Sequence, residues 1–259
     1  IKFSKNFTVP TLSKPAALEW GLEYRHNTYQ IGAGDYQSWA QGPYYNGLNS
    51  PGSTGYNGFQ PTNAGNWSRD IFDGHVGLDF FVTPKWEWTL GGHVVNYSDT
   101  VTAPTGSIGT RYNFTKTFAV HANVNTGYRP PTLGAIHYDA TSSGPGYTTV
   151  NLSETSEVAR LLGAHAPKGE YSRSYSIGID YKPIPSLQLT LDAYRIDIND
   201  RIESTSAFTG STMAAYLAAQ GVGSNITYAS YMTNIGNTST NGFTTKATYK
   251  FPIKPAYGE

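Results

Sequence analysis

Apolar and polar residues alternate along most of the chain. In residues 171–181, tyrosine and isoleucine occupy every odd position except Arg173, while serine, glycine and aspartate occupy the even ones. Residues 71–82, 86–97 and 118–128 alternate in the same way. A period of two places the apolar side chains on one face of a β-strand. The pattern predicts nine strands, at 1–9, 16–30, 69–83, 86–99, 104–114, 118–128, 171–182, 186–203 and 228–251.

The connections between these strands fall into two length classes, and only the join at 100–103 departs from their alternation. The short joins contain Pro or Lys-Thr, and the long joins are rich in Gly, Ser, Asn and Tyr. Helical spacing is confined to two segments within the long joins, 153–164 and 210–221. The short joins lie at 10–15, 84–85, 115–117 and 183–185, and the long ones at 31–68, 129–170 and 204–227.

A soluble β-sandwich and a transmembrane β-barrel would both alternate in this way. The strands are longer than the five or six residues that are typical of soluble sheets. Aromatic residues gather at the strand ends, as in the two girdles of a membrane barrel, and the two classes of join match its periplasmic and extracellular ends. In lipid every backbone polar group must be paired, so only a closed barrel satisfies a sheet there. We therefore predict an all-β, antiparallel transmembrane β-barrel.

The composition fits this fold and excludes several functions. Only 14% of residues are charged and the formal net charge is zero, so nothing points to nucleic acid as a partner. Cysteine is absent, which excludes thiol catalysis and Cys-ligated metals within the chain. No window approaches 18 apolar residues, so no transmembrane helix is expected. Neither a Ser-His-Asp arrangement nor paired catalytic carboxylates stand out, and we expect no enzyme activity and no cofactor.

One predicted strand changes phase part-way along its length. In 186–203, Leu189, Leu191 and Ala193 share one side, but the later apolar residues, such as Ile196, lie on the other. Either a β-bulge lies at the change, or the strand has left the bilayer and polar side chains on its outer face meet water. A strand needs only about 9–11 residues to cross a membrane, so we prefer the second explanation.

Several motifs resemble those of one family, in the same order along the chain. The stretch TGYRPPTLGAIHY at 126–138 looks like the GfRaPsl signature of TonB-dependent outer-membrane receptors. Three further stretches resemble strand motifs of that family: LEWGLEYRHNTYQIGAGD at 18–35, HVVNYSD at 93–99 and YMTNIGNTSTNGFTTKATYKF at 231–251. His93 departs from the family pattern, which has arginine at that position.

The resemblance implies a barrel of about 22 strands, of which residues 1–259 would form a central to late section. The family's plug domain and TonB box are not in this sequence. The implied protein is an outer-membrane receptor of Gram-negative cells, surrounded by lipid and lipopolysaccharide. It would bind a scarce nutrient (siderophore, vitamin or oligosaccharide) and import it with energy from the TonB complex of the inner membrane. A passive porin, or less closely a surface adhesin, is the alternative.

Three histidines are candidate ligand contacts on the inward face. His75 lies nine residues before Pro84 and His93 nine residues after it, so the two should sit at the same height on paired strands. His121 should face inward two strands further on. None of these histidines has the close spacing of a metal site. We therefore expect ligand contact or a merely polar wall, and no metal.

The remaining candidates lie at a strand end and in the long joins. Arg129 precedes two prolines that rigidify the chain, which favours a structural role over ligand contact. Glu19, Glu23 and Arg25 should alternate inward, either holding the plug or forming a solvated wall. Aromatic residues in loops can stack on sugars or flat chelates, or pack within their own loop. These aromatic candidates are Tyr36, Trp39, Tyr44, Tyr45, Tyr56, Phe59 and Trp67.

Overall fold

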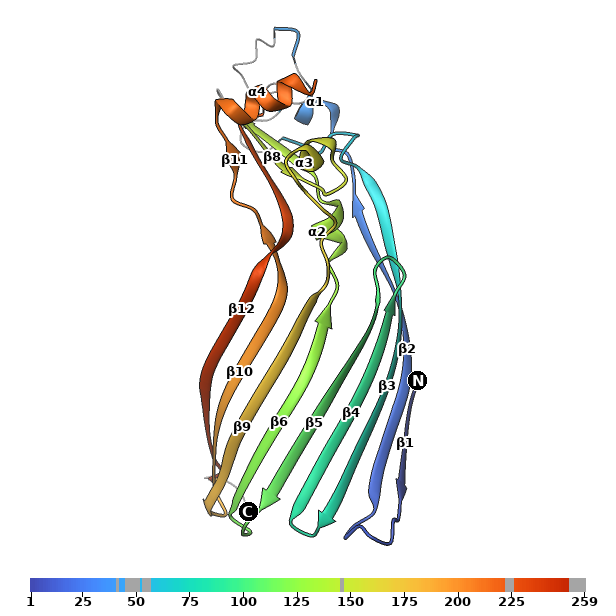
Figure 1. Ribbon diagram of the computed structural model, residues 1–259, viewed down its shortest axis with the longest axis vertical. Helices are drawn as coiled ribbons and strands as arrows, with labels where there is room; N and C mark the ends of the chain where they lie inside the picture. Colours follow the sequence, from blue (N-terminus) through green and yellow to red (C-terminus); the bar gives the residue numbers. More distant parts are fainter. Residues whose placement is uncertain (41, 45–51, 53–56, 145–146, 222–225, 252–259) are drawn as a thin grey trace, which may run out of the picture.

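Long antiparallel strands run side by side as one wall, with tight turns at one end and small helices and strands at the other (Figure 1). The computed structural model describes residues 1–40, 42–44, 52, 57–144, 147–221 and 226–251. The nine predicted strands are confirmed, and the largest difference is that β3 begins earlier than expected. They are, in their order across the sheet, β1 (Lys2–Phe7), β2 (Ala16–Ile31), β3 (Gly65–Thr83), β4 (Trp86–Tyr97), β5 (Thr102–Asn113), β6 (Phe118–Arg129), β9 (Glu170–Ile184), β10 (Leu187–Ser204) and β12 (Tyr228–Tyr249).

The strand register gives the wall an apolar face and a polar face. Between β6 and β9, Ala122 lies opposite Ile177, and the next pair, Asn123 and Ser176, points to the other side. Large side chains of the apolar face are exposed, Ile177 by 58% and Phe243 by 80%. Water rarely faces so extended an apolar surface on a soluble protein. The apolar face therefore suits lipid, as the predicted barrel requires.

Within the described part of the chain, β1 and β12 are not paired with each other, so the wall is an open sheet. Aromatic rings form a row along the turn end of the apolar face. Trp86 lies 5.6 Å from Trp88 and 6.3 Å from Tyr112, measured between ring centroids. Phe114 continues the row at 4.7 Å from Tyr112. Further ring pairs lie towards the loop end, Tyr24 with Phe72 and Tyr128 with Tyr171. These two positions are those expected for interfacial girdles.

The phase change in β10 has no bulge beside it. The register against β9 and β12 runs unbroken from Leu189 to Ile198, which excludes the bulge explanation at Ala193. The irregularity comes later, between Ile198 and Ile202, where Asp200 adopts a φ of 56°. Arg195 thus stays on the same side as the leucines. This is the arrangement expected if the outer end of β10 stands above the bilayer.

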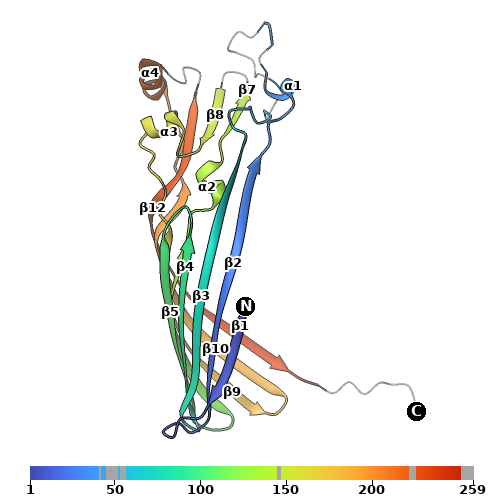
Figure 2. The same ribbon diagram turned by 90° about the vertical axis from the view of Figure 1, so that its right-hand side faces the viewer.

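Small helices and strands gather at the loop end of the wall (Figure 2). Their buried side chains form a small core there. Leu217 from a helix and Ala229 from β12 are fully buried in it, together with Val150 and Leu152. Two helices lie within the predicted helical segments, α3 (Glu157–Leu161) and α4 (Ser211–Ala219). The short elements that were not predicted are α1 (Tyr36–Trp39), α2 (Leu133–His137), β7 (Ala140–Gly144), β8 (Tyr147–Leu152) and β11 (Phe208–Thr209).

Strand β8 pairs with β7 and runs parallel to the outer part of β12, while β11 pairs with β12 as well. The long joins after β6 and β10 are therefore tied together above the wall. None of the helices in the described ranges is long and apolar enough to cross a membrane.

Helix α2 begins where β6 leaves the sheet. Pro130 and Pro131 have no N–H to continue the ladder, so β6 ends at Arg129. The Thr132 hydroxyl then caps the helix by accepting a hydrogen bond from the Ala135 N–H at 3.0 Å. Helix α2 packs against β2 and β3, which lie four and three strands from β6 in the sheet order. The segment after β6 therefore crosses the polar face of the wall.

Candidate functional site

Two adjoining recesses lie at the loop end of the polar face. The first, of about 440 Å³, is called here the aromatic recess. Its volume is within the range of small-molecule sites. Helix α2 and strands β2, β8, β10 and β12 contribute to it. Its lining includes three tyrosines with hydroxyl and amide side chains around them, namely Tyr29, Tyr138, Tyr231, Thr132, Asn151 and Ser230.

The second recess shares Tyr29, Thr132 and Gly134 with the first and contains three arginines; it is called here the arginine recess. Each arginine has a carboxylate partner. Arg25 Nε lies 2.9 Å from Glu23, Arg69 Nε lies 2.6 Å from Asp99, and Arg129 holds Glu170 through two hydrogen bonds of 2.7 and 2.8 Å. Arg69 is only 4% exposed, and its Nη2 has no partner in the described residues. The positive charges around this recess are therefore already balanced.

The segment 130–139, called here the strap, is held against β2 and β3 by stacked rings. The His137 ring lies 4.6 Å from the Trp67 ring and is tilted from it by only 7°, and Trp67 in turn stacks on Tyr29. The Asn63 side-chain amide donates a hydrogen bond to Asp139 at 3.3 Å. Burial lowers the pKa of His137 and raises the pKa of Asp139. The strap thus forms one side of the aromatic recess.

Trp67 was expected in a loop, and this placement was wrong, because β3 already begins at Gly65. A Cβ added at Gly65 would lie 2.4 Å from the Trp67 ring, so the glycine makes room for the ring on the polar face. Trp67 therefore supports the strap through stacking, and it is not among the residues that line either recess.

The histidine geometry expected from the sequence is confirmed. His75 and His93 are register partners with their rings 6.5 Å apart on the polar face. The carboxylate of Asp73 lies between them, 2.5 Å from His93 Nε2 and 3.8 Å from His75 Nδ1. The His75 ring also covers Gly21 on the neighbouring strand. In the described part of the chain, no three His, Cys, Asp or Glu residues are grouped to hold a metal ion.

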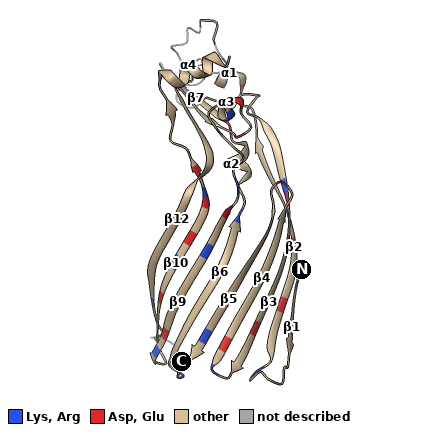
Figure 3. Cartoon of the chain, viewed as in Figure 1, with Lys and Arg blue, Asp and Glu red and all other residues tan. Residues whose placement is uncertain are grey.

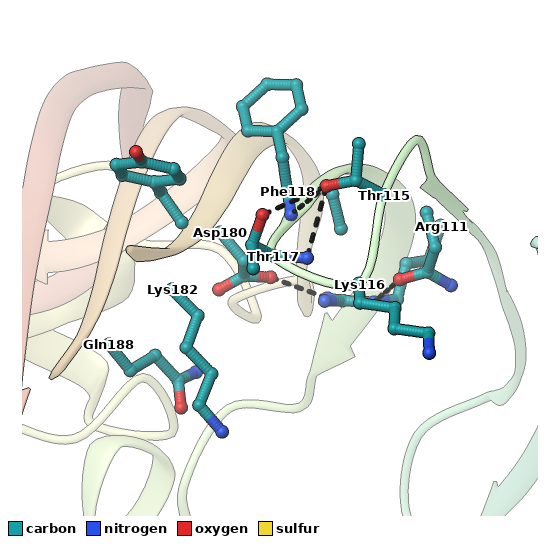
Figure 4. A pocket seen from close by; sticks show the side chains of 11 residues that line it. Arg111, Thr115, Lys116, Thr117, Phe118, Asp180, Lys182 and Gln188 are labelled. Carbon is teal, nitrogen blue, oxygen red and sulfur yellow. Dashed lines mark hydrogen bonds and ion pairs between the residues drawn. The ribbon is translucent and has the colours of Figure 1, made fainter. Parts of the chain in front are cut away.

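His121 belongs to a polar network nearer the turn end. Its Nε2 lies 2.7 Å from Asp192, and its Nδ1 lies 3.3 Å from Asp180 without hydrogen-bond geometry. Arg111 and Thr190 also bond to Asp180. Figure 4 shows Arg111 and Asp180 facing each other beside the turn between β5 and β6. Each residue of this network bonds to another residue of the wall, which indicates a role in joining four strands.

Lys, Arg, Asp and Glu positions are scattered along the described strands (Figure 3). Glu19 pairs with Lys2 and Glu23 with Arg25, on the polar face as expected. Arg129 binds the buried carboxylate of Glu170, which favours the structural role over ligand contact. The contact of these residues with a plug or a ligand stays a prediction.

The aromatic candidates of the first long join that the structure describes do not line either recess. Tyr36 and Trp39, the first and last residues of α1, form an edge-to-face pair at 5.0 Å, and the Trp39 Nε1–H donates to the Gly34 carbonyl. Tyr44 is 93% exposed. The Phe59 ring meets the Tyr138 ring edge-on at 6.0 Å. Tyr45 and Tyr56 lie outside the described residues.

Sequence reasoning missed the tyrosines of the aromatic recess, although two signals pointed to them. Tyr29 occupies an inward position of the alternating segment 16–30, and Thr132, Gly134 and Tyr138 all lie inside the motif at 126–138. What the sequence did not show is that this motif turns back over β2 and β3.

Comparison with known proteins agrees with the architecture. The family model described as TonB dependent receptor-like, beta-barrel, matches residues 4–258. A search of curated proteins finds no match. Among solved structures, a variant of the ferric enterobactin receptor PfeA from Pseudomonas aeruginosa, in complex with enterobactin, superposes with a TM-score of 0.64 at 15% identity, covering 98% of this chain and 33% of that one.

The siderophore receptor PirA from Acinetobacter baumannii gives a TM-score of 0.62 at 15% identity, covering 96% of this chain and 34% of PirA. The chain thus spans about a third of the length of these receptors. At such identities the likeness concerns the fold alone, but the family model covers nearly all of the sequence. The chain therefore belongs to the family of TonB-dependent receptor β-barrels.

Proposed function

We propose that this chain forms part of the barrel wall and of the outer opening of a Gram-negative outer-membrane receptor that imports a ferric siderophore. The observation that carries the proposal is a two-faced wall with a recess at its loop end. The exposed apolar face suits lipid, and the polar face carries a ligand-sized recess where substrate would arrive from outside. Siderophore receptors among the structural neighbours support an iron chelate over a vitamin or an oligosaccharide.

The proposed receptor needs partners beyond this sequence. A plug domain inside the barrel would couple the recess to the TonB complex of the inner membrane, and the apolar face would contact lipid and lipopolysaccharide. The chain itself contributes binding groups and wall, and we propose no catalysis. A passive porin is the second candidate, since a polar lumen serves both functions.

Dependence on TonB separates the two candidates. The full-length receptor would be expressed in a strain that lacks its own siderophore receptors. This strain would be supplied with the iron-55-loaded siderophore fraction from an iron-starved culture of the source organism. We expect uptake that is saturable and that disappears when tonB is deleted. Equal uptake with and without tonB would support the porin and contradict the receptor.

A further inference from the structure

The described residues that line the aromatic recess carry no charge. None of them is an Asp, Glu, Lys, Arg or His. The rings of Tyr29, Tyr138 and Tyr231 are accompanied by hydroxyl, amide and thioether groups. The hydroxyls of Tyr29 and Tyr138 make no hydrogen bond within the described part of the chain, whereas the Tyr231 hydroxyl donates to the Leu162 carbonyl. Two phenol groups are therefore free to bond a ligand.

The neighbouring arginine recess does not supply a net positive charge either. Its three guanidinium groups, on Arg25, Arg69 and Arg129, face three carboxylates, on Glu23, Asp99 and Glu170. The sum of these six charges is zero. The unpartnered Arg69 Nη2 is shielded from solvent, so it lies behind the surface that a ligand would meet. An anion in either recess would lose water without gaining an unpaired cation.

We propose that the aromatic recess binds an uncharged portion of the ligand, so that the receptor prefers neutral ferric chelates to polyanionic ones. Tyrosine rings stack on flat faces, and phenol hydroxyls donate to the oxygens of a neutral chelate. The inference rests on the proposed function, and adds to it the charge of the chelate and the wall residues that select it. It predicts that charge, more than size, separates good ligands from poor ones.

Gly134 offers a way to fill the recess without distorting the wall. The atoms nearest to a Cβ added there would be those of the Tyr29 ring, at 3.7 Å, and the Thr132 hydroxyl, at 3.9 Å, which are ordinary contacts. In Gly134→Leu the rest of the side chain would occupy the recess. Gly32→Leu is the matched control, because nothing lies within 4 Å of a Cβ at Gly32. Ala135→Lys is a second variant that adds a cation to the lining.

The test measures binding to the purified full-length receptor of two hexadentate iron-55 complexes of similar size. One is an uncharged trihydroxamate, and the other is a tricatecholate with three negative charges. We expect the trihydroxamate to bind about tenfold or more tightly. Gly134→Leu should weaken its binding by a similar factor and Gly32→Leu should not. Ala135→Lys should move the preference towards the tricatecholate, a gain that misfolding cannot produce.

The possible results separate the two proposals. Tighter binding of the tricatecholate by the unmodified receptor would overturn the charge inference while leaving siderophore import standing. Unchanged trihydroxamate binding in Gly134→Leu would also overturn it, because the recess would then not be the binding site. Binding of neither iron complex would overturn the proposed function together with the inference.

Discussion

The contact between Arg129 and Glu170 should hold the outer ends of three strands, β6, β9 and β10, in place. Glu170 is 5% exposed and accepts two hydrogen bonds from Arg129 and one, at 2.8 Å, from the Ile202 N–H. This last bond reaches β10 just beyond its irregular stretch. Nearby, the Asn234 side chain of β12 bonds to the carbonyls of Lys168 and Asp200. Replacing Arg129 by Met would leave the buried carboxylate with only the Ile202 N–H.

The free-energy cost of Arg129→Met depends on the hydrogen bonds that Glu170 loses and on how far water replaces them. A hydrogen bond to a charged group contributes about 1.5–3 kcal/mol, and the change removes two of them. The Arg129 side chain is 63% exposed, so solvent already weakens this pair. A net loss of about 2 kcal/mol remains, which corresponds to about 30-fold faster local opening, at 1.4 kcal/mol per factor of ten.

Hydrogen exchange followed by mass spectrometry on the full-length receptor measures this opening. In Arg129→Met, peptides around Ile202 should exchange about 30-fold faster, with no change near the turn end of β10. Arg195→Met is the matched control, because Arg195 pairs with Asp197 at an exposed site and such pairs contribute about 0–1 kcal/mol. Equal exchange at Ile202 in the two variants would refute the reasoning.

Three further predictions test other parts of the structure. Leu189→Arg places a charge on the apolar face, at a cost of about 2–4 kcal/mol near the membrane midplane. It should reduce the fraction of folded barrel, measured as the band whose gel mobility changes on heating, and a normal folded fraction would contradict the placement of Leu189 towards lipid. Burial lowers the pKa of His137, so the neutral ring stabilises the strap. That stability is full above the ordinary pKa of about 6.5 and is lost as pH falls through and below it, so the protection of the α2 amides, corrected for intrinsic exchange at each pH, should be lower at pH 5 than at pH 7. The variant His137→Gln should abolish this difference, and equal corrected protection at the two pH values in the unmodified protein would argue against the prediction. Gly242→Val would place a Cβ 2.6 Å from Tyr194 Cζ and should impair assembly; adding Tyr194→Ala should restore it, and a double variant no better than the single one would exclude the contact.

The alternation of residues was sufficient to predict the wall. Because a period of two depends only on neighbouring residues, it located all nine strands of the wall. It also predicted that Glu19, Glu23 and Arg25 lie on the polar face. Counting from one turn also placed His75 opposite His93. These successes share one physical basis, since a hairpin fixes register once its turn and its alternation are known.

The aromatic recess could not be predicted, because it depends on contacts between segments far apart in the chain. Tyr29 and Tyr231 come from opposite parts of the sheet order, and the strap brings Gly134 and Tyr138 between them. Only the inward position of Tyr29 and the motif at 126–138 hinted at this region. The early start of β3 was also hidden, since Gly65 reads as a loop residue until the Trp67 ring is seen to cover it.

The central claim is that the wall separates lipid from water, and β9 offers the most direct test. The chain has no cysteine, so single cysteines can be introduced one at a time into the full-length receptor, with any cysteine elsewhere replaced by serine. A water-soluble maleimide would then be applied to intact outer membranes. We predict labelling of Ser174→Cys and Ser176→Cys on the polar face, and protection of Ile177→Cys and Ile179→Cys on the apolar face, with all four reacting after denaturation. Equal labelling of the two sets in the membrane would contradict the account.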